Sequence, residues 1–195
     1  MSRHALAWQV TLFMGLQSLS YYATISWFPT MFIDHGIRAA SAGNLLALMN
    51  VGNAATGLVV PALAQRMRDQ RLLAAVAVVA IMIGTIGSVF APNTVVVIFV
   101  GLLGLGQGAS LGLAVFMFTA RTTDGQGAAA LSGFAQGVGY LIASAGPLLL
   151  GFLHTTTGGW TVPAITLLAV AAVQLVAGLQ GGRALTIGTG LGGAG

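Results

Sequence analysis

Charge is the scarcest feature of this sequence. Only 5% of its 195 residues are charged, as seven arginines with no lysine and three aspartates with no glutamate. Soluble domains carry roughly 25% charged residues, so the composition excludes an ordinary soluble domain and is typical of a membrane protein. Cysteine is absent as well, which removes disulfide and thiol chemistry from consideration.

The stretches without charge set the expected number of helices. No Asp, Glu, Lys or Arg occurs within 4–33, 39–65, 72–120 or 125–182. A helix needs about 20 apolar residues to cross a bilayer, so the first two stretches hold one span each. The last two are long enough for helical hairpins, broken at "APNT" and "HTTTGGW". Runs such as "LLAAVAVVAIMIGTIGSVF" do not alternate as the strands of a barrel would.

The sequence therefore predicts an all-α membrane protein in which residues 1–183 form one six-helix transmembrane domain. A glycine-rich tail, 184–195, is expected to be disordered. The helices are expected at about 6–32, 40–63, 72–90, 95–119, 130–152 and 161–180.

The arginines predict the orientation, because positively charged short loops stay in the cytoplasm. In the six-helix arrangement only Arg38 falls on one side. We therefore expect both termini to be cytoplasmic, in a bacterial inner membrane. The positive charge of +4 then needs no nucleic-acid partner, since the arginines are spread over four segments rather than clustered on one face. The arginines expected on the cytoplasmic side are Arg3, Arg66, Arg68, Arg71, Arg121 and Arg183.

The stretch "GLGQGASLG", residues 104–112, has three interpretations. A dinucleotide-binding turn must follow a strand, and this stretch lies inside an apolar run of membrane length. A nucleophile elbow would need a base near Ser110, and a serine hydroxyl is a weak nucleophile without one. The third interpretation is a stripe of small residues that lets another helix approach closely. We favour this packing stripe, formed by Gly104, Gly108 and Gly112.

A second glycine pair and the histidines complete these expectations. Gly133 and Gly137 repeat the four-residue spacing, so we expect them to pack closely too, whereas Gly84 is expected to face lipid. The three histidines lie in loops or at helix ends, with no HExxH spacing. The sequence therefore predicts no metal, no cofactor and no enzymatic activity.

Polar side chains lie mainly in four of the six predicted helices. Such residues are costly in hydrocarbon, so they usually face a cavity, a partner helix or the bundle interior. The first, second, fourth and fifth helices are expected to line a cavity, and the third and sixth to be peripheral. The alternative is that these side chains only hydrogen-bond between helices. The candidates for contacting a solute or shaping its cavity are Gln17, Tyr21, Asn50, Asn53, Gln107, Gln136 and Tyr140.

Three residues inside predicted helices remove or weaken backbone hydrogen bonds. They are Pro61 and the pair Gly146 and Pro147. Such positions suit kinks or gating segments, and the alternative is a static bend.

The chain resembles the C-terminal half of a major facilitator superfamily transporter, and more narrowly the cyanate and 2-nitroimidazole permease family. The resemblance covers about residues 7–183. It is carried by "WQVTLFMGLQSLSYYATISWFP", "DQR", "GLGQGASLGL", "AAALSGFAQGVGYLIASAGPLLLG" and "GGWTVP". It implies twelve helices in two halves, with a small solute bound between them and alternating access by rocking of one half against the other. The implied partners are the bilayer, the solute, and an N-terminal half or a second copy of this chain.

Two features depart from the family pattern. The loop "LAQRMRDQR" lies where the superfamily repeats its cytoplasmic signature, with Arg66, Arg68, Asp69 and Arg71 as its charged residues. Gln65 replaces the acid and Arg68 the glycine of that signature. The N-terminal half is also missing, which leaves a fragment, a truncated reading frame or a half-transporter that dimerises. We expect a secondary transporter of a small solute, and the alternative is a non-transporting membrane protein, either an inert remnant or an assembly partner.

Overall fold

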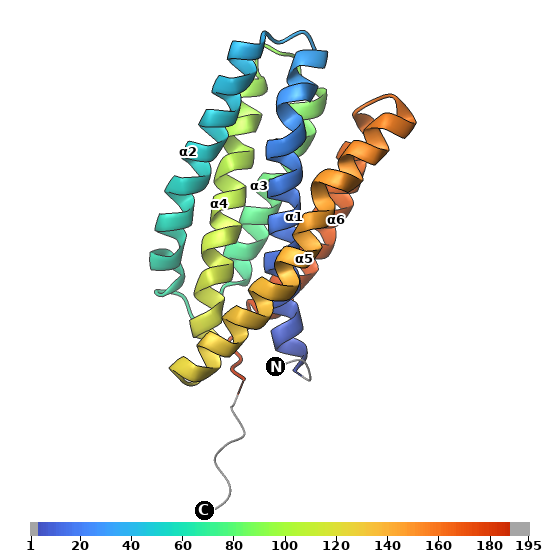
Figure 1. Cartoon of the computed structure of the whole chain (residues 1–195). Helices are drawn as coiled ribbons and strands as arrows, with labels where there is room; N and C mark the ends of the chain where they lie inside the picture. Colours follow the sequence, from blue (N-terminus) through green and yellow to red (C-terminus); the bar gives the residue numbers. More distant parts are fainter. Residues whose placement is uncertain (1–3, 188–195) are drawn as a thin grey trace, which may run out of the picture.

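The computed structural model describes residues 4–187, and within them the chain forms six α-helices joined by short loops (Figure 1). Residues 1–3, including Arg3, and 188–195 lie outside the described part. The helices are α1 (Ala5–Asp34), α2 (Ala39–Ala64), α3 (Arg71–Phe90), α4 (Val96–Ala120), α5 (Gly125–Thr157) and α6 (Thr161–Gly181).

The fifth helix is longer than expected at both ends. It begins at Gly125 rather than near residue 130, because the Asp124 carboxylate caps it by accepting a 2.6 Å hydrogen bond from the Gly127 N–H. At the other end the three threonines 155–157 stay helical, and each hydroxyl is satisfied by donating to a carbonyl four residues earlier. The helix stops at Gly158, whose φ of 68° is the left-handed conformation that ends many helices.

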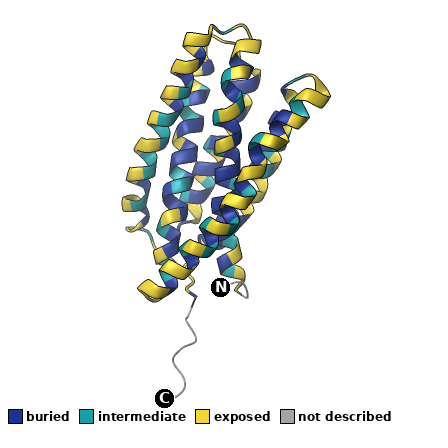
Figure 2. Cartoon of the chain, in the orientation of Figure 1, coloured by how far each residue is buried: buried dark blue, intermediate teal, exposed yellow. Residues whose placement is uncertain are grey.

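The two central helices are α1 and α4. In the described chain α2 lies mainly against α4, and α5 lies mainly against α1. On the opposite side α3 and α6 pack against the central pair and against each other. Figure 2 shows the result: α2 and α5 are exposed over much of their length, while the interior of the bundle is buried. One side of α2 and of α5 is thus left without a neighbouring helix among the described residues, and we call it the open side of the bundle.

Five of the six described helices, α2 to α6, are long and apolar enough to cross a membrane, and α1 is not among them. α1 has the length of a span, with 30 residues, but it carries polar side chains such as Gln17, Ser18 and Ser20. All three are buried, because α1 packs against α2, α4, α5 and α6. A helix that is screened from lipid in this way does not need a uniformly apolar surface.

The glycine stripe of α4 lies directly against the backbone of α2. A Cβ atom on Gly112 would stand 2.6 Å from the carbonyl oxygen of Gly57, closer than real Cβ atoms approach. Added Cβ atoms at Gly104 and Gly108 would overlap the carbonyl oxygens of Met49 and Asn53. Successive glycines of α4 therefore meet successive turns of α2, which is how small residues allow membrane helices to approach closely.

The second predicted stripe is wrong for the described chain. A Cβ atom on Gly133 or Gly137 would meet no atom of another element within 4 Å. α5 instead meets α1 through Gly139, Gly146 and Gly151, which lie against Gly15, Leu19 and Trp27. Two residues along a helix turn it by about 200°, so Gly137 points away from the contact that Gly139 makes.

The expectation that Gly84 faces lipid is also wrong. Gly84 is buried, and an added Cβ would stand 2.7 Å from the backbone of Leu103 in α4. The exposed apolar surface of α3 is instead a stripe of large side chains at helical spacing: Leu72, Val76, Val79, Ile83, Ile86 and Phe90.

An aromatic cluster fixes the turn between α5 and α6 to the end of α1. The indole N–H of Trp160 donates to the Asp34 carboxylate at 2.9 Å, and the His154 ring stacks on Trp160 with centroids 3.9 Å apart. Two turns earlier, the Trp27 N–H donates to the Pro147 carbonyl at 2.8 Å. These bonds hold the long α5 against α1.

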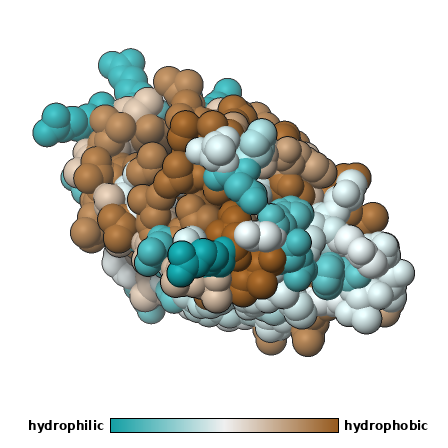
Figure 3. All heavy atoms as spheres, turned by 90° about the horizontal axis from the view of Figure 1, so that it is seen from above, coloured by the Kyte–Doolittle hydropathy of each residue, from teal (hydrophilic) through white to brown (hydrophobic). Residues whose placement is uncertain are grey.

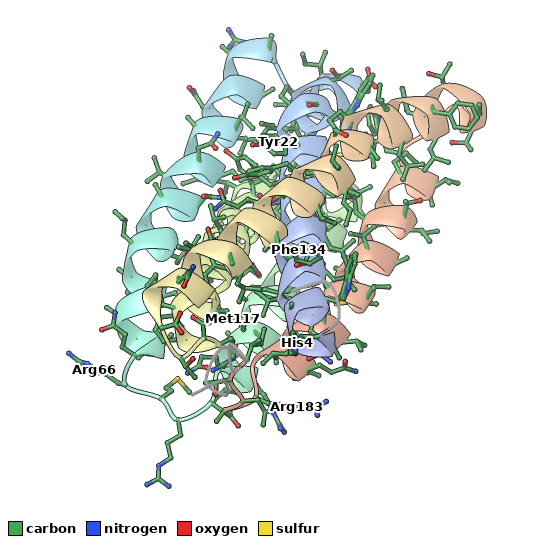
Figure 4. The ribbon with its side chains drawn as sticks, turned by 60° about the horizontal axis from the view of Figure 1, so that its bottom comes forward. His4, Tyr22, Arg66, Met117, Phe134 and Arg183 are labelled. Atoms are coloured by element: carbon green, nitrogen blue, oxygen red, sulfur yellow. The ribbon has the colours of Figure 1, made fainter. Side chains whose placement is uncertain are left out.

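The arginines divide between the ends of the bundle as the sequence predicts. Because the helices alternate in direction, the loops carrying Arg66, Arg68, Arg71, Arg121 and Arg183 lie at one end, which we call the arginine-rich end. Figure 4 shows Arg66, Arg183 and His4 there. Arg38 lies at the opposite end, between α1 and α2.

Candidate functional site

The predicted cavity residues form two levels, one buried between α1 and α4 and one nearer the open side of the bundle. In the buried level the Gln17 amide donates to the Gln107 carbonyl at 3.3 Å, and the Gln107 amide donates to the Thr24 hydroxyl at 3.4 Å. Ser18 donates to Gln17 Oε1 at 3.1 Å. Gln17 is 1% exposed and Gln107 is fully buried, so these two residues can shape a site from beneath but do not face solvent.

The outer level joins α1 to α2. The Tyr21 hydroxyl donates to Asn50 Oδ1 at 2.7 Å, and the Asn50 amide donates back to the Leu46 carbonyl at 2.9 Å. Both side chains are partly buried. Tyr21 and Asn50 are therefore held in fixed orientations, with the tyrosine hydroxyl still able to accept a hydrogen bond.

The polar residues of α5 stand apart from this pair. The Gln136 amide donates to the Ser132 hydroxyl of its own helix at 2.6 Å, and Tyr140 is 46% exposed. No hydrogen bond between described residues joins Gln136 or Tyr140 to α1 or α2. The polar stripe Ser132, Gln136 and Tyr140 is offset by one residue from the buried stripe Leu131, Ala135 and Gly139, so it lies about 100° around the helix.

Asn53 lines a hollow of about 360 Å³ between α2 and α4. Its amide nitrogen is buried and has no partner among the described residues. The rest of the hollow is apolar, with Gly57, Pro61, Leu111 and Gly112 among its walls. Pro61 has no N–H, so the Gly57 carbonyl loses its donor within the helix, and that carbonyl faces Gly112.

Gly146 and Pro147 lie inside a continuous α5, as Pro61 lies inside a continuous α2. Gly146 has a packing role, because an added Cβ would stand 2.6 Å from the Leu19 carbonyl of α1. The gating role expected of these three residues remains a prediction.

A buried arginine, which sequence reasoning treated only as a topology signal, organises the arginine-rich end. Arg121 is 3% exposed and follows the last residue of α4. Its guanidinium donates to the carbonyls of Gly181 at 2.7 Å and Gly182 at 3.0 Å, and to the Gln70 side chain. Gln70 in turn donates to the Ala64 carbonyl at 3.2 Å.

The contacts of Arg121 bring together three helix ends of the same sign. The C-termini of α2, α4 and α6 meet here, and each carries partial negative charge on its unpaired carbonyls. Burial lowers the pKa of Arg121, an effect opposed by the nearby Asp69, yet arginine stays protonated in proteins. A spacing argument could not have found this site, because the partners are backbone carbonyls.

Arg121 also holds the chain beyond α6. The Ile187 N–H donates to the Arg121 carbonyl at 2.7 Å, and Ile187 is 4% exposed. The expected disorder is therefore wrong for 184–187, because the buried, hydrogen-bonded Ile187 anchors the end of that segment, while 188–195 lie outside the described residues.

The charged loop after α2 is held locally. The Asp69 carboxylate accepts from the Arg71 N–H at 3.2 Å and lies 3.8 Å from its guanidinium, and both side chains are about half exposed. Arg66 and Arg68 are exposed. Nothing in this geometry ties the four charged residues to a gate within the described chain.

The other two interpretations of residues 104–112 find no support in the geometry. The stretch is helical throughout, and the Ser110 hydroxyl accepts from the Gln174 amide at 3.3 Å. Within the described part of the chain no three His, Cys, Asp or Glu side chains come together as a metal site would require.

The architecture is that of a multi-pass membrane protein whose polar side chains gather between two central helices and on an open side. Comparison with known proteins finds similarity to transporters. The chain is 40% identical over 181 residues to the 2-nitroimidazole transporter of Escherichia coli (strain K12), covering 93% of this chain and 46% of the relative.

Two further relatives are also named as transport proteins. The uncharacterized transporter YycB of Bacillus subtilis (strain 168) is 39% identical over 91% of this chain and 44% of its own length. The cyanate transport protein CynX of Escherichia coli (strain K12) is 33% identical over 79% of this chain and 40% of its own length. No family model matches the chain. The chain spans about half the length of the curated relatives it matches.

Proposed function

We propose that this chain is one half of a secondary transporter that moves a small solute of the cyanate or nitroimidazole kind. The observation that carries the proposal is the polar open side of α1, α2 and α5, in a chain that matches about half of each transporter relative. A second half would close over that side. Alternating access then follows from rocking of the two halves.

In this proposal the two levels of polar residues have different roles. Tyr21, Asn50, Gln136 and Tyr140 offer hydrogen bonds to the solute, because they are only partly buried in this half. Gln17 and Gln107 fix the crossing of α1 and α4 beneath them. The described helices carry no charged side chain at mid-span, so solute recognition here rests on amides and hydroxyls.

The proposal includes topology. All six helices cross a bacterial inner membrane, α1 screened by its neighbours, and the arginine-rich end faces the cytoplasm with both termini. The competing proposal is a non-transporting membrane protein.

Uptake measurements test the proposal. The chain should be co-expressed with, or fused to, the part of the Escherichia coli 2-nitroimidazole transporter that it does not match, and uptake of labelled 2-nitroimidazole and cyanate measured in cells. We expect uptake with both halves and none with either half alone, since alternating access needs two halves. Uptake by the isolated chain as a monomer, or no uptake by folded paired halves, would contradict the proposal.

Point variants then separate solute contact from helix contact. Tyr21→Phe removes one hydroxyl and its 2.7 Å bond to Asn50, so uptake should fall several-fold. Gln136→Leu should also reduce uptake without reducing the amount in the membrane. Tyr22→Phe is the matched control, because Tyr22 is a neighbouring tyrosine, 41% exposed, without a hydrogen bond in the described chain (Figure 4). Equal uptake by all three variants would assign Tyr21 and Gln136 to helix contacts alone.

A further inference from the structure

The end of the bundle opposite the arginine-rich end carries a hollow of about 450 Å³. It lies where the loop before α2 meets the loop before α4, and Figure 3 looks onto this end. Its polar lining comes from Arg38, Ser41, Asn44 and Asn93, and its apolar lining from Ile37, Leu45, Val96 and Val97.

The walls of the hollow are tied together. The Asn93 side-chain amide donates to the His35 carbonyl at 2.9 Å, which joins the loop before α4 to the loop before α2. Ser41 lies three residues after Arg38 and Asn44 three residues after Ser41, so successive turns of α2 present them on one side. The hollow is thus lined by donors held on two connected elements.

The charge in the hollow is positive and unpaired. Arg38 is exposed, and its guanidinium forms neither an ion pair nor a hydrogen bond with any described residue. The carboxylate at this end of the described chain, Asp34, accepts from the Trp160 indole instead. A planar guanidinium with five donors beside amides and a hydroxyl matches a carboxylate, which accepts two parallel hydrogen bonds.

We propose that this hollow is a binding site for a small organic anion, whose carboxylate is bound by Arg38 and whose apolar body lies on Leu45, Val96 and Val97. Binding at this hollow does not depend on the proposed transport function. A fixed positive charge raises the local concentration of an anion.

The test uses the full chain in phosphatidylcholine nanodiscs with 4-fluorobenzoate as probe, followed by fluorine NMR line broadening. Arg38→Gln should weaken binding roughly tenfold, since it removes a charge-assisted hydrogen-bond pair. Arg38→Lys should retain part of the affinity, because a lysine keeps the charge without the fork. The matched control is Arg66→Gln, the same charge change at an exposed arginine of the other end, and it should bind as the unchanged chain does.

A second arm separates a free solute from a lipid headgroup, which offers similar anionic chemistry. Nanodiscs containing phosphatidylglycerol should bind the probe as tightly as phosphatidylcholine discs if the site takes a soluble anion. Displacement of the probe by phosphatidylglycerol, relieved in Arg38→Gln, would instead assign the site to a lipid phosphate and overturn the proposal. Equal broadening in the unchanged chain and Arg38→Gln would overturn it as well. Binding without uptake in paired halves would refute only the transport function.

Discussion

Replacing Gly112 by alanine would place a methyl group 2.6 Å from the Gly57 carbonyl oxygen and 3.0 Å from the ring of Pro61. Ordinary contact begins at 3.4 Å, so α2 would have to move away from α4 by about 0.8 Å. The same movement strains the 2.8 Å hydrogen bond from the Thr56 hydroxyl to the Leu105 carbonyl, which crosses between the two helices.

Two opposing effects set the change in unfolding free energy for Gly112→Ala. Overpacking a close contact costs about 1–3 kcal/mol. Alanine is better than glycine inside a helix by about 1 kcal/mol, which offsets part of that cost. Gly137→Ala is the matched control, because it gains the helix term and meets no atom of another element within 4 Å. The two variants should therefore differ in unfolding free energy by about 1–3 kcal/mol, with Gly137→Ala the more stable.

The assay is reversible unfolding of the purified chain in mixed micelles of mild detergent and sodium dodecyl sulfate, followed by tryptophan fluorescence. Gly108→Ala should be less stable than Gly112→Ala, since its methyl would overlap both the Asn53 carbonyl and the Thr56 hydroxyl. Equal stability of Gly112→Ala and Gly137→Ala would refute the argument that α2 and α4 approach through the glycine stripe.

Three further outcomes are expected. Arg121→Gln should lower the unfolding free energy by roughly 2–3 kcal/mol or more, because it leaves buried carbonyls without donors. Arg183→Gln, at an exposed position, should change the unfolding free energy by less than about 0.5 kcal/mol. Similar losses in both variants would show that the burial of Arg121 does not matter for stability. Reporter fusions after Arg71 should be cytoplasmic and fusions near Asn93 periplasmic, and a periplasmic result after Arg71 would defeat the proposed topology. Asp124→Ala should cost about 1 kcal/mol through loss of the α5 cap, with Asp124→Asn retaining most of it.

Much of the fold followed from local patterns. Charge-free stretches bounded by charged residues located the helices, since charges are excluded from hydrocarbon and helices satisfy the backbone there. The predicted bounds of the fifth helix were wrong at both ends. Asp124 and the threonines 155–157 are residue types common in loops, and their hydrogen bonds to nearby backbone are visible only in the structure. Of the candidate site, the pairing of Tyr21 with Asn50 was not evident from spacing, because the two residues belong to different helices.

The sequence by itself determined which residues share a face of a helix, and the tertiary structure decided which face meets a neighbour. Gly108 and Gly137 belong to stripes of the same spacing, yet one lies against backbone and the other has open space. Gln107 and Gln136 are both mid-helix amides, but only the first is enclosed by the central helices. Sequence periodicity gives the direction of a side chain around its own helix axis, whereas burial depends on where the other helices lie. Arg121 is buried only because three helix ends converge on it.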